Sequence, residues 1–156
     1  MALLGGAVSV ITTDGEAGRF GFTASAVCSV TDQPPTLLVC MNRASYAHAH
    51  FQRNGVLAVN VLSAALKDIS AVFADRELDS AQRFARASWS TLQSGAPLLD
   101  EALVNFDCRI ANSHEVGSHT IFYCEVLGVR QADGQDGLMY FNRAYHRLGK
   151  DSMAVH

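Results

Sequence analysis

The chain has 156 residues and a mass of 16.8 kDa, the size of one domain with one core. Apolar residues make up 49% and charged residues 17%, so the chain can bury a core and lacks the composition of a disordered protein. The net charge is −3 and lysine and arginine form no block, which argues against a surface for nucleic acid or anionic membrane. No apolar run reaches the roughly 18 residues of a membrane-spanning helix.

The N-terminus and the cysteines indicate the compartment. Residues 1–6 lack the positive region and the cleavage site of a signal peptide. The four cysteines contain no Cys-x-x-Cys pair, which excludes a zinc ribbon and a thioredoxin-like motif. Each lies in an apolar, strand-like run, so we expect Cys28, Cys40, Cys108 and Cys124 to be buried and reduced. Reduced thiols are typical of cytoplasmic proteins, and we expect a cytoplasmic location.

Strand patterns dominate the first sixty residues. Runs of β-branched and apolar residues predict strands over residues 7–13, 20–23, 27–31, 36–41 and 56–62. The turn at residues 14–18 joins the first two strands as a hairpin, and Pro34-Pro35 breaks the chain before the fourth. Residues 45–52 have helix character, which Asn54-Gly55 ends.

A helix and further long strands are predicted for the rest of the chain. Ser63 suits the N-cap of a helix with apolar residues at three- and four-residue spacing: Leu66, Ile69, Val72 and Phe73. The charged stretch 75–88 is expected to attach to the core through Phe84 and Trp89. Two long strands over 103–111 and 119–129 flank residues 113–118. A last strand covers 138–141 and precedes a polar, aromatic tail at 142–147.

These elements predict a mainly β protein made of a single domain over residues 1–156. Six or seven strands are not separated by regular crossover helices, which disfavours a doubly wound parallel sheet. A mostly antiparallel small barrel with a few short helices packed against it fits better. The sequence has neither Gly-x-Gly-x-x-Gly nor a Walker loop, so any nucleotide must be held without those motifs.

Hydroxyl and small side chains gather at residues 23–30, where the second predicted strand ends. Small residues let a flat ligand approach the backbone, and hydroxyl and free N–H groups can bond its carbonyl and ring nitrogen atoms. The same residues suit a tight turn that uses Ser and Thr for local backbone bonds. Both interpretations stay open at this point.

The run Asn42-Arg43-Ala44-Ser45 lies at a predicted junction from strand to helix. The first N–H groups of a helix bind anions, and Ser45 would add a hydroxyl and Arg43 a charge, which suits phosphate. An ordinary N-cap with a solvated arginine is equally compatible with these residues.

The histidines fall into separate groups. His48 and His50 are two residues apart, which on a helix turns them to different faces, so no metal site is predicted. His119 and His146, the latter beside Tyr145, are better placed for ligand contact, although a lone strand histidine is usually structural. Neither Gly-x-Ser-x-Gly nor His-Glu-x-x-His is present, which gives a hydrolase little support.

Taken together, these segments resemble the short-chain flavin reductases, the reductase components of two-component flavin-dependent monooxygenases such as aromatic hydroxylases. The matching pieces cover nearly the whole chain in order: residues 6–15, 21–30, 34–40 with Asn42 and Ser45, 58–62, 72–74, 83–84, 117–122 and 145–146. The resemblance implies an FMN-binding split β-barrel of Greek-key type. It also implies a homodimer with the flavin near the subunit interface.

The resemblance also implies roles for particular residues. Thr23, Ala24, Ser25 and Ala26 would line the isoalloxazine ring, and residues 42–45 would hold the phosphate side. Cys40 and Met41, just before them, would also bind the cofactor. Phe73 and Ala74 would lie beside the flavin, and His119, Tyr145 and His146 near the nicotinamide nucleotide.

The implied activity is reduction of FMN or FAD by NADH or NADPH, with reduced flavin supplied to a partner monooxygenase. Hydride transfer is done by the cofactors, so the protein needs only to stack and orient the rings. This agrees with the lack of an acid–base dyad. His119 is assigned a positioning and electrostatic role in catalysis.

Two other functions remain compatible with the sequence. One is a flavin-using reductase of another substrate, such as a corrin. The other is a non-catalytic split barrel that binds flavin or haem. His119, Tyr145 and His146 argue against the second, because a storage protein needs no second nucleotide site.

Overall fold

The computed structural model describes residues 1–149, 152 and 155, and within them the protein is mainly β. The strands of this part of the chain are β1 Gly6–Ala7, β2 Ser9–Thr13, β3 Phe20–Ala24, β4 Val27–Asp32, β5 Pro35–Asn42, β6 Val56–Val61, β7 Trp89–Ser90, β8 Leu98–Leu99, β9 Val104–Val116, β10 His119–Gln131, β11 Gly137–Phe141 and β12 Ala144–Leu148. All of their pairings are antiparallel.

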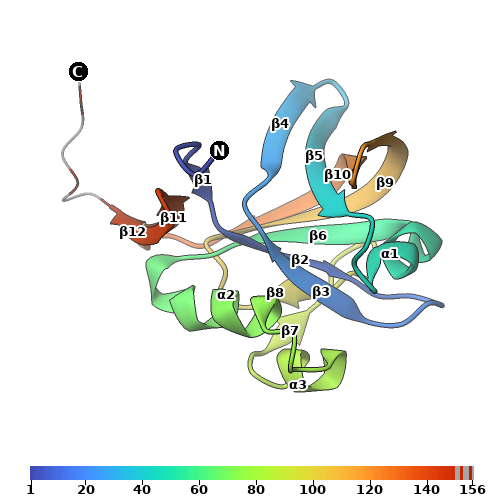
Figure 1. The fold of residues 1–156 in the computed structure, drawn as a ribbon, viewed down its shortest axis with the longest axis horizontal. Coiled ribbons are helices and arrows are strands. Elements are labelled where there is room, and N and C mark those ends of the chain that lie inside the picture. Colours follow the sequence, from blue (N-terminus) through green and yellow to red (C-terminus); the bar gives the residue numbers. More distant parts are fainter. Residues whose placement is uncertain (150–151, 153–154, 156) are drawn as a thin grey trace.

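A seven-stranded sheet forms the body of the molecule, in the order β3-β2-β6-β9-β10-β5-β4. Its two edge strands, β3 and β4, follow each other in the chain, and only Ser25 and Ala26 separate them. The sheet curls so that these edges approach each other at this connection (Figure 1). No ladder joins β3 to β4, so the sheet is not closed.

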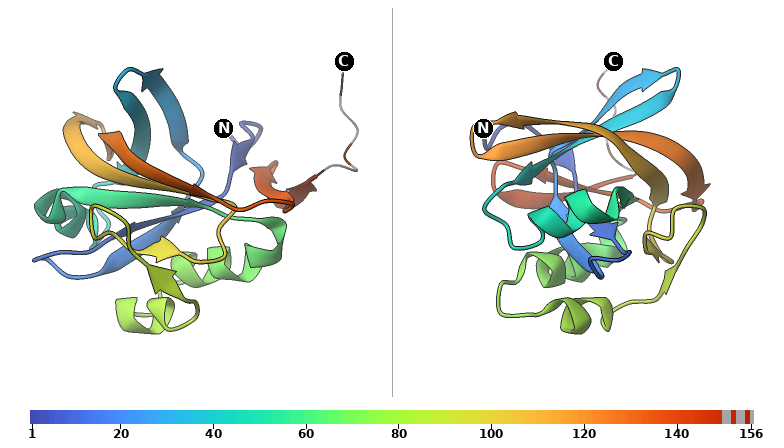
Figure 2. Two further views of the ribbon diagram at one scale, coloured as in Figure 1. Left: turned by 180° about the vertical axis from the view of Figure 1, so that it is seen from behind. Right: turned by 90° about the vertical axis from the view of Figure 1, so that its right-hand side faces the viewer.

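A three-stranded sheet, β1-β11-β12, forms an arm at one end of the molecule. Figure 2 shows this arm at the opposite end from the tip of the β9–β10 hairpin. The arm is tied to the body at its base, because Val8 N–H donates to Leu138 O (3.0 Å) and Leu62 N–H donates to Val8 O (2.9 Å).

The helices are short and lie against the outside of the sheet (Figure 1). They are α1 His48–Asn54, the 3-10 turn η1 Ala64–Leu66, α2 Lys67–Ala74 and α3 Ser80–Phe84. α1 ends at Gly55, whose φ of 68° is left-handed. α3 begins with a capping box in which Asp79 and Gln82 bond each other's backbone N–H groups. Among the described residues, no helix has the length and apolarity needed to cross a membrane.

Two apolar clusters form the core. One lies between the curled faces of the main sheet around Ile11, Val39, Phe51 and Phe122. The other joins α2 and α3 to the sheet, and in it Phe73 packs edge-on to Phe84 at 5.2 Å and to Trp89 at 5.6 Å between ring centroids. Phe84 and Trp89 therefore anchor the charged stretch, as the sequence predicted.

Polar side chains also cross the interior. Asn60 on β6 and Asn105 on β9 are register partners, and both are fully buried. Asn105 Nδ2 donates to Asn60 Oδ1 (2.7 Å), and Asn60 Nδ2 donates to Val10 O (2.9 Å). Arg130 Nε on β10 donates to Asn105 Oδ1 (3.0 Å). The pair thus connects four neighbouring strands of the sheet.

The structure corrects several sequence predictions. β9 continues through residues 113–116 to a tight turn at Gly117-Ser118, because the two strands keep pairing to the hairpin tip. Most of the tail at 142–147 belongs to β12, because Asn142 and Arg143 take left-handed φ values of 49° and 62° and reverse the chain after β11. α1 begins at His48 rather than Ser45.

The thiols also differ in part from expectation. All four are free, and Cys108 and Cys124 are buried, as predicted. Burial raises the pKa of Cys124 to about 12. Cys40 is half-buried and Cys28 is exposed, because β4 is an edge strand whose outer face is open.

Gly21 allows β3 to approach α2 closely, which leads to a testable stability effect. A Cβ atom there would lie 2.7 Å from Phe73 Cε1 and 3.2 Å from Ile11 O. Gly21→Ala should therefore displace Phe73 from Phe84 and Trp89 and lower the free energy of unfolding by about 1–3 kcal/mol in urea titrations. Gly128→Ala is the control, because its Cβ would meet Leu92 at an ordinary 3.6 Å. Equal stability of the two variants would contradict this packing.

Candidate functional site

Segment 23–26 crosses the open edge between β3 and β4. Ser25 and Ala26 are exposed, and no hydrogen bond among the described residues uses their N–H groups. Ala26 O accepts from Cys40 N–H at 3.1 Å, which fixes the segment against β5. Gly6 packs on the same segment, because a Cβ there would lie 3.0 Å from Ser25 O. Free backbone donors and small side chains are what a flat heterocycle with carbonyl and ring nitrogen acceptors requires.

Ser70 on α2 joins this segment to the C-terminal arm. Thr23 Oγ1 donates to Ser70 O (2.6 Å), and the Ser70 hydroxyl shares a hydrogen bond with Tyr145 OH (2.7 Å). Ser70 is completely buried. Its two bonds bring Thr23 and Tyr145, which are far apart in the sequence, to the same turn of one helix.

A cavity of about 580 Å³ lies beside Tyr145 and His146. Its other walls are the start of η1 and α2, including Ser63 and Lys67, and the residues just before β11, including Asp136. Neither His119 nor segment 42–45 lines it.

A larger cleft of about 860 Å³ lies on the other side of the site. Asn42 and Ser45 line it at the end of β5, and Arg76 and Arg83 line it from the α2–α3 connection and α3. An Asx turn in which Ala44 N–H donates to Asn42 Oδ1 (2.9 Å) shapes the first wall. Ser45 stands in the turn before α1, so its predicted role as the first residue of a helix is wrong.

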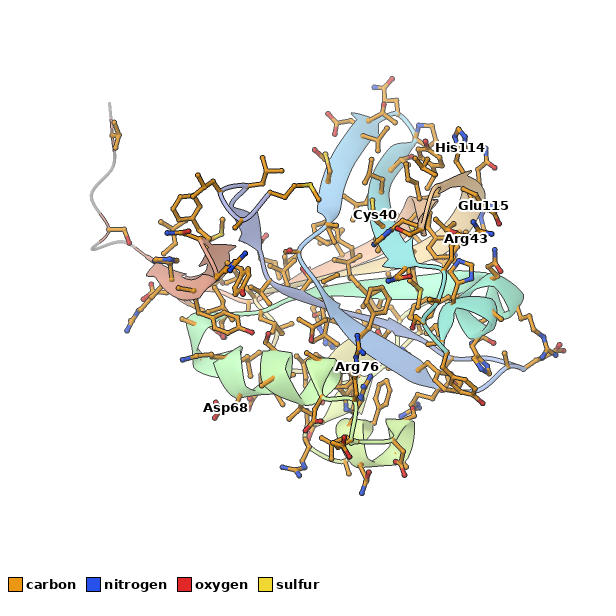
Figure 3. All side chains as sticks on the ribbon, viewed as in Figure 1. Cys40, Arg43, Asp68, Arg76, His114 and Glu115 are labelled. Carbon is orange, nitrogen blue, oxygen red and sulfur yellow. The ribbon has the colours of Figure 1, made fainter. Side chains whose placement is uncertain are left out.

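The arginines that line this cleft are Arg76 and Arg83, and not Arg43, which the sequence predicted. Arg43 turns away, donates to Gly117 O (3.0 Å) and pairs with Glu115 at 3.3 Å on the β9–β10 hairpin. Figure 3 shows Arg43 and Glu115 together at that end of the molecule. Arg76 forms no ion pair with the described residues, and Arg83 Nε is buried without a partner among them. Sequence reasoning missed both because no motif separates them from the other arginines of the 75–88 stretch.

His119 lies on the cleft side, away from Tyr145 and His146. It is the register partner of Asn42, and its Nδ1 shares a hydrogen bond with Ser118 Oγ (2.8 Å). His146 lies on β12, where its Nε2 contacts Phe141 O at 3.2 Å. The hairpin tip and the arm are at opposite ends of the molecule (Figures 1 and 2). One chain therefore does not bring the three predicted nicotinamide residues together.

The remaining predicted site residues have unequal access to a ligand. The Phe73 ring and the Met41 side chain are buried in the core, so their side chains contribute packing rather than ligand contact. Ala74 is exposed at the end of α2, and Cys40 is half-buried on the outer face of β5. Burial raises the pKa of Cys40, which keeps it a neutral thiol.

His48 is a buried residue that contacts the strand next to His119. Its Nε2 is 2.8 Å from Thr120 Oγ1, next to His119, and the side chain is buried against Phe122. Burial lowers the pKa of His48, and the nearby Arg43 lowers it further. The neutral ring is thus the form that the fold accommodates.

Known proteins are similar to this chain in both sequence and fold. A profile described as "Flavin reductase like domain" matches residues 1–149. A protein of Stutzerimonas stutzeri (strain A1501), named FMN reductase (NADH) RutF, is 57% identical over 148 residues, or 95% of this chain and 84% of that protein.

Two solved structures are similar over most of their length. The NADH:FAD oxidoreductase SgcE6 of Streptomyces globisporus C-1027, in complex with NAD and FAD fragments, has a TM-score of 0.88 and 29% identity, covering 97% of this chain and 90% of that chain. The styrene monooxygenase flavin reductase SMOB of Pseudomonas putida S12 has a TM-score of 0.84 and 25% identity, covering 99% and 96%.

Burial of His48 should make stability fall in acid. The pKa of this ring is below its ordinary value of about 6.5 in the folded chain, so below that pH the unfolded chain binds a proton that the folded chain resists. As the pH falls from about 7.5 to about 5.5, the free energy of unfolding of the parent should therefore decrease. In the His48→Gln variant the decrease over the same range should be smaller. The exposed His114→Gln variant serves as the matched loss of a histidine outside the core, and a pH slope in His48→Gln equal to that of the parent would contradict the assignment.

Proposed function

The chain belongs to the flavin reductase-like domain family, and from that membership we propose that it is an NADH-dependent reductase of FMN, and of FAD as a second flavin. The family expected from the sequence is thereby confirmed. The observation that carries the proposal is the 57% identity to a protein named FMN reductase (NADH) over nearly the whole chain. The cleft and segment 23–26 supply matching chemistry.

The residues present fit a flavin ring at segment 23–26. The unpaired N–H groups of Ser25 and Ala26 are donors for ring carbonyl and nitrogen atoms, and the small side chains leave the backbone accessible. The flavin, when bound, supplies the electron acceptor for the hydride of NADH. Thr23 and Ala24 hold one end of the segment through Ser70 and β2, and Cys40 holds the other.

The phosphate side of the flavin fits the larger cleft. Asn42 and Ser45 offer an amide and a hydroxyl, and Arg76, which forms no ion pair with the described residues, offers the positive charge that Arg43 does not. Arg83 adds charge to the same wall, although its Nη1 and Nη2 donate to Gly21 O (2.9 Å) and Asp75 O (2.6 Å). Planar guanidinium groups bind phosphate through paired N–H donors. Ala74 stands at the end of α2, just before Arg76.

We assign the finer fold as a split β-barrel of one domain over residues 1–156, opened between β3 and β4. The curled sheet with consecutive edge strands supports this assignment. A flavin lying along segment 23–26 would then cover the open edge.

The functional unit is proposed to be a homodimer. The outer faces of β4 and of the β9–β10 tip are open, and Val30 and Val116 are 48% and 54% exposed there. A two-fold interface would bring His119 of one subunit to Tyr145 and His146 of the other, which a single chain keeps apart. His119 would then position the nicotinamide rather than transfer a proton.

The reduced flavin is proposed to leave for a partner monooxygenase. Similarity to the styrene monooxygenase flavin reductase supports this partner class. The free thiols of the chain fit the reducing cytoplasm, where we place the protein.

The activity is tested by following NADH oxidation with FMN, FAD and riboflavin in turn. In the same assay, Arg76→Gln and Ser45→Leu should raise the KM of FMN and FAD about tenfold and leave that of riboflavin nearly unchanged, because only the first two present an anion to the cleft. Arg86→Gln, an exposed arginine outside the cleft, is the control. Equal losses for all three flavins would place the phosphate elsewhere.

The shared site can be tested by subunit mixing. His119→Ala and Tyr145→Ala should each raise the KM of NADH or lower turnover without changing flavin affinity. Refolding the two variants together should restore about one quarter of the parent activity, since half of the dimers are mixed and half of their sites are intact. Sedimentation at the mass of a monomer with flavin bound, or no recovery on mixing, would refute the shared site.

A further inference from the structure

The cavity beside the C-terminal arm contains polar groups that the flavin site does not use. It measures about 580 Å³ and has Ser63 and Lys67 on one wall and Tyr145 and His146 on the other. Segment 23–26 does not line it, but Tyr145 and Thr23 both bond Ser70, so the cavity lies next to that segment.

Ser63 presents an unsatisfied hydroxyl in this wall. The residue is only 2% exposed, and its Oγ has no hydrogen-bond partner among the described residues. Ser63 stands at the N-cap position of η1, yet its side chain makes no capping bond. A buried hydroxyl without a partner is costly, and the cost is removed when a ligand oxygen accepts a hydrogen bond from it.

Lys67 supplies the available charge. Its Nζ lies 5.6 Å from the centre of the Tyr145 ring and forms no ion pair with the described residues. The other strong cation of the cavity, Arg147, is already paired with Asp136. An anionic group entering the cavity would therefore meet the Lys67 ammonium and the Ser63 hydroxyl together.

We propose that Lys67 and Ser63 bind the pyrophosphate of NADH, with the Tyr145 ring between this site and segment 23–26. The inference rests on the proposed function, because it takes the nicotinamide dinucleotide to be the ligand. A phosphate oxygen accepts from both side chains, and the nicotinamide end then extends past Tyr145 toward Thr23. Lys67 thereby becomes a determinant of nucleotide binding that does not touch the flavin.

The geometry also explains why the cavity is aromatic on one side. Tyr145 is held by its hydroxyl on Ser70, so the ring cannot swing away when the lysine leaves it for a phosphate. Lys67 is exposed and flexible enough to make that exchange.

The experiment uses the flavin-loaded protein and two probes, NADH in the kinetic assay and ADP-ribose in calorimetry. Lys67→Gln should raise the KM of NADH and the Kd of ADP-ribose together by about tenfold, with turnover at saturating NADH and the Kd of FMN unchanged. Ser63→Ala should raise both by a smaller factor, about threefold. Lys67→Arg should restore most of the affinity. Asp68→Asn, on the next residue of α2 and outside the cavity, should match the parent (Figure 3).

The outcomes separate this inference from the function on which it rests. If the parent protein oxidises NADH but Lys67→Gln changes neither NADH KM nor ADP-ribose affinity, the pyrophosphate site is wrong and the reductase function stands. A parallel loss of FMN affinity would also overturn it, because the cavity would then belong to the flavin. If the parent oxidises no NADH with any flavin, the proposed function itself fails. Thermal denaturation of each variant shows whether Ser63→Ala alters folding rather than binding.

Discussion

The buried amide pair of Asn60 and Asn105 is the constraint on which the rest of the structure depends. Each amide inside a sheet must find all of its partners, since leaving one unpaired costs about 1–3 kcal/mol. Here the partners are the Val10 carbonyl on β2, the backbone of Leu99 on β8 and the Arg130 guanidinium on β10. A shift of one residue in any of these strands would break several bonds at once, so the pair fixes the register of the sheet.

That register fixes the site. β6 ends at Val61, and Ser63, three residues after Asn60, bridges to Gly137 at the start of β11. The helix carrying Lys67 and Ser70 and the hairpin carrying Tyr145 therefore begin from one point of the sheet. The cavity between them, and the contact of Ser70 with Thr23, follow from this common origin.

Much of the fold could be predicted from the sequence because the strands are strongly patterned. The β-branched runs, the hairpin at residues 14–18 and the helix after Ser63 were all visible in the order of residue types. The β12 strand was not, since it depends on left-handed φ values at Asn142 and Arg143, residues that do not mark a turn as an Asn-Gly pair would. The end of β9 was missed because its tip is polar and exposed, so pairing rather than burial keeps it extended.

In the candidate site, too, local features could be predicted from the sequence and long-range contacts could not. The runs at 23–30 and 42–45 stand out in the sequence because their small and hydroxyl side chains are local features, and the family resemblance narrows the first to residues 23–26. The direction of Arg43 could not, since it depends on Glu115 and Gly117, more than seventy residues away. The positions of Arg76 and Lys67, on which their proposed roles rest, likewise emerge only when distant elements are assembled. The separation of His119 from Tyr145 is a property of the topology.

The two-residue connection between β3 and β4 also has a mechanical consequence. Both of its ends are bonded to the same sheet, at Ser9 and at Cys40, so its length is matched to a fixed gap. A residue inserted here would move the inward-facing side chains of β4 to its outer face and the outward-facing ones to its inner face. The solvent-exposed β4–β5 loop is not held to a fixed length in this way. Changes in length during evolution or design should thus gather at the far end of β4 and spare this junction. The connection at Ser25 and Ala26, where the curled sheet opens, is therefore also the place that tolerates inserted residues least.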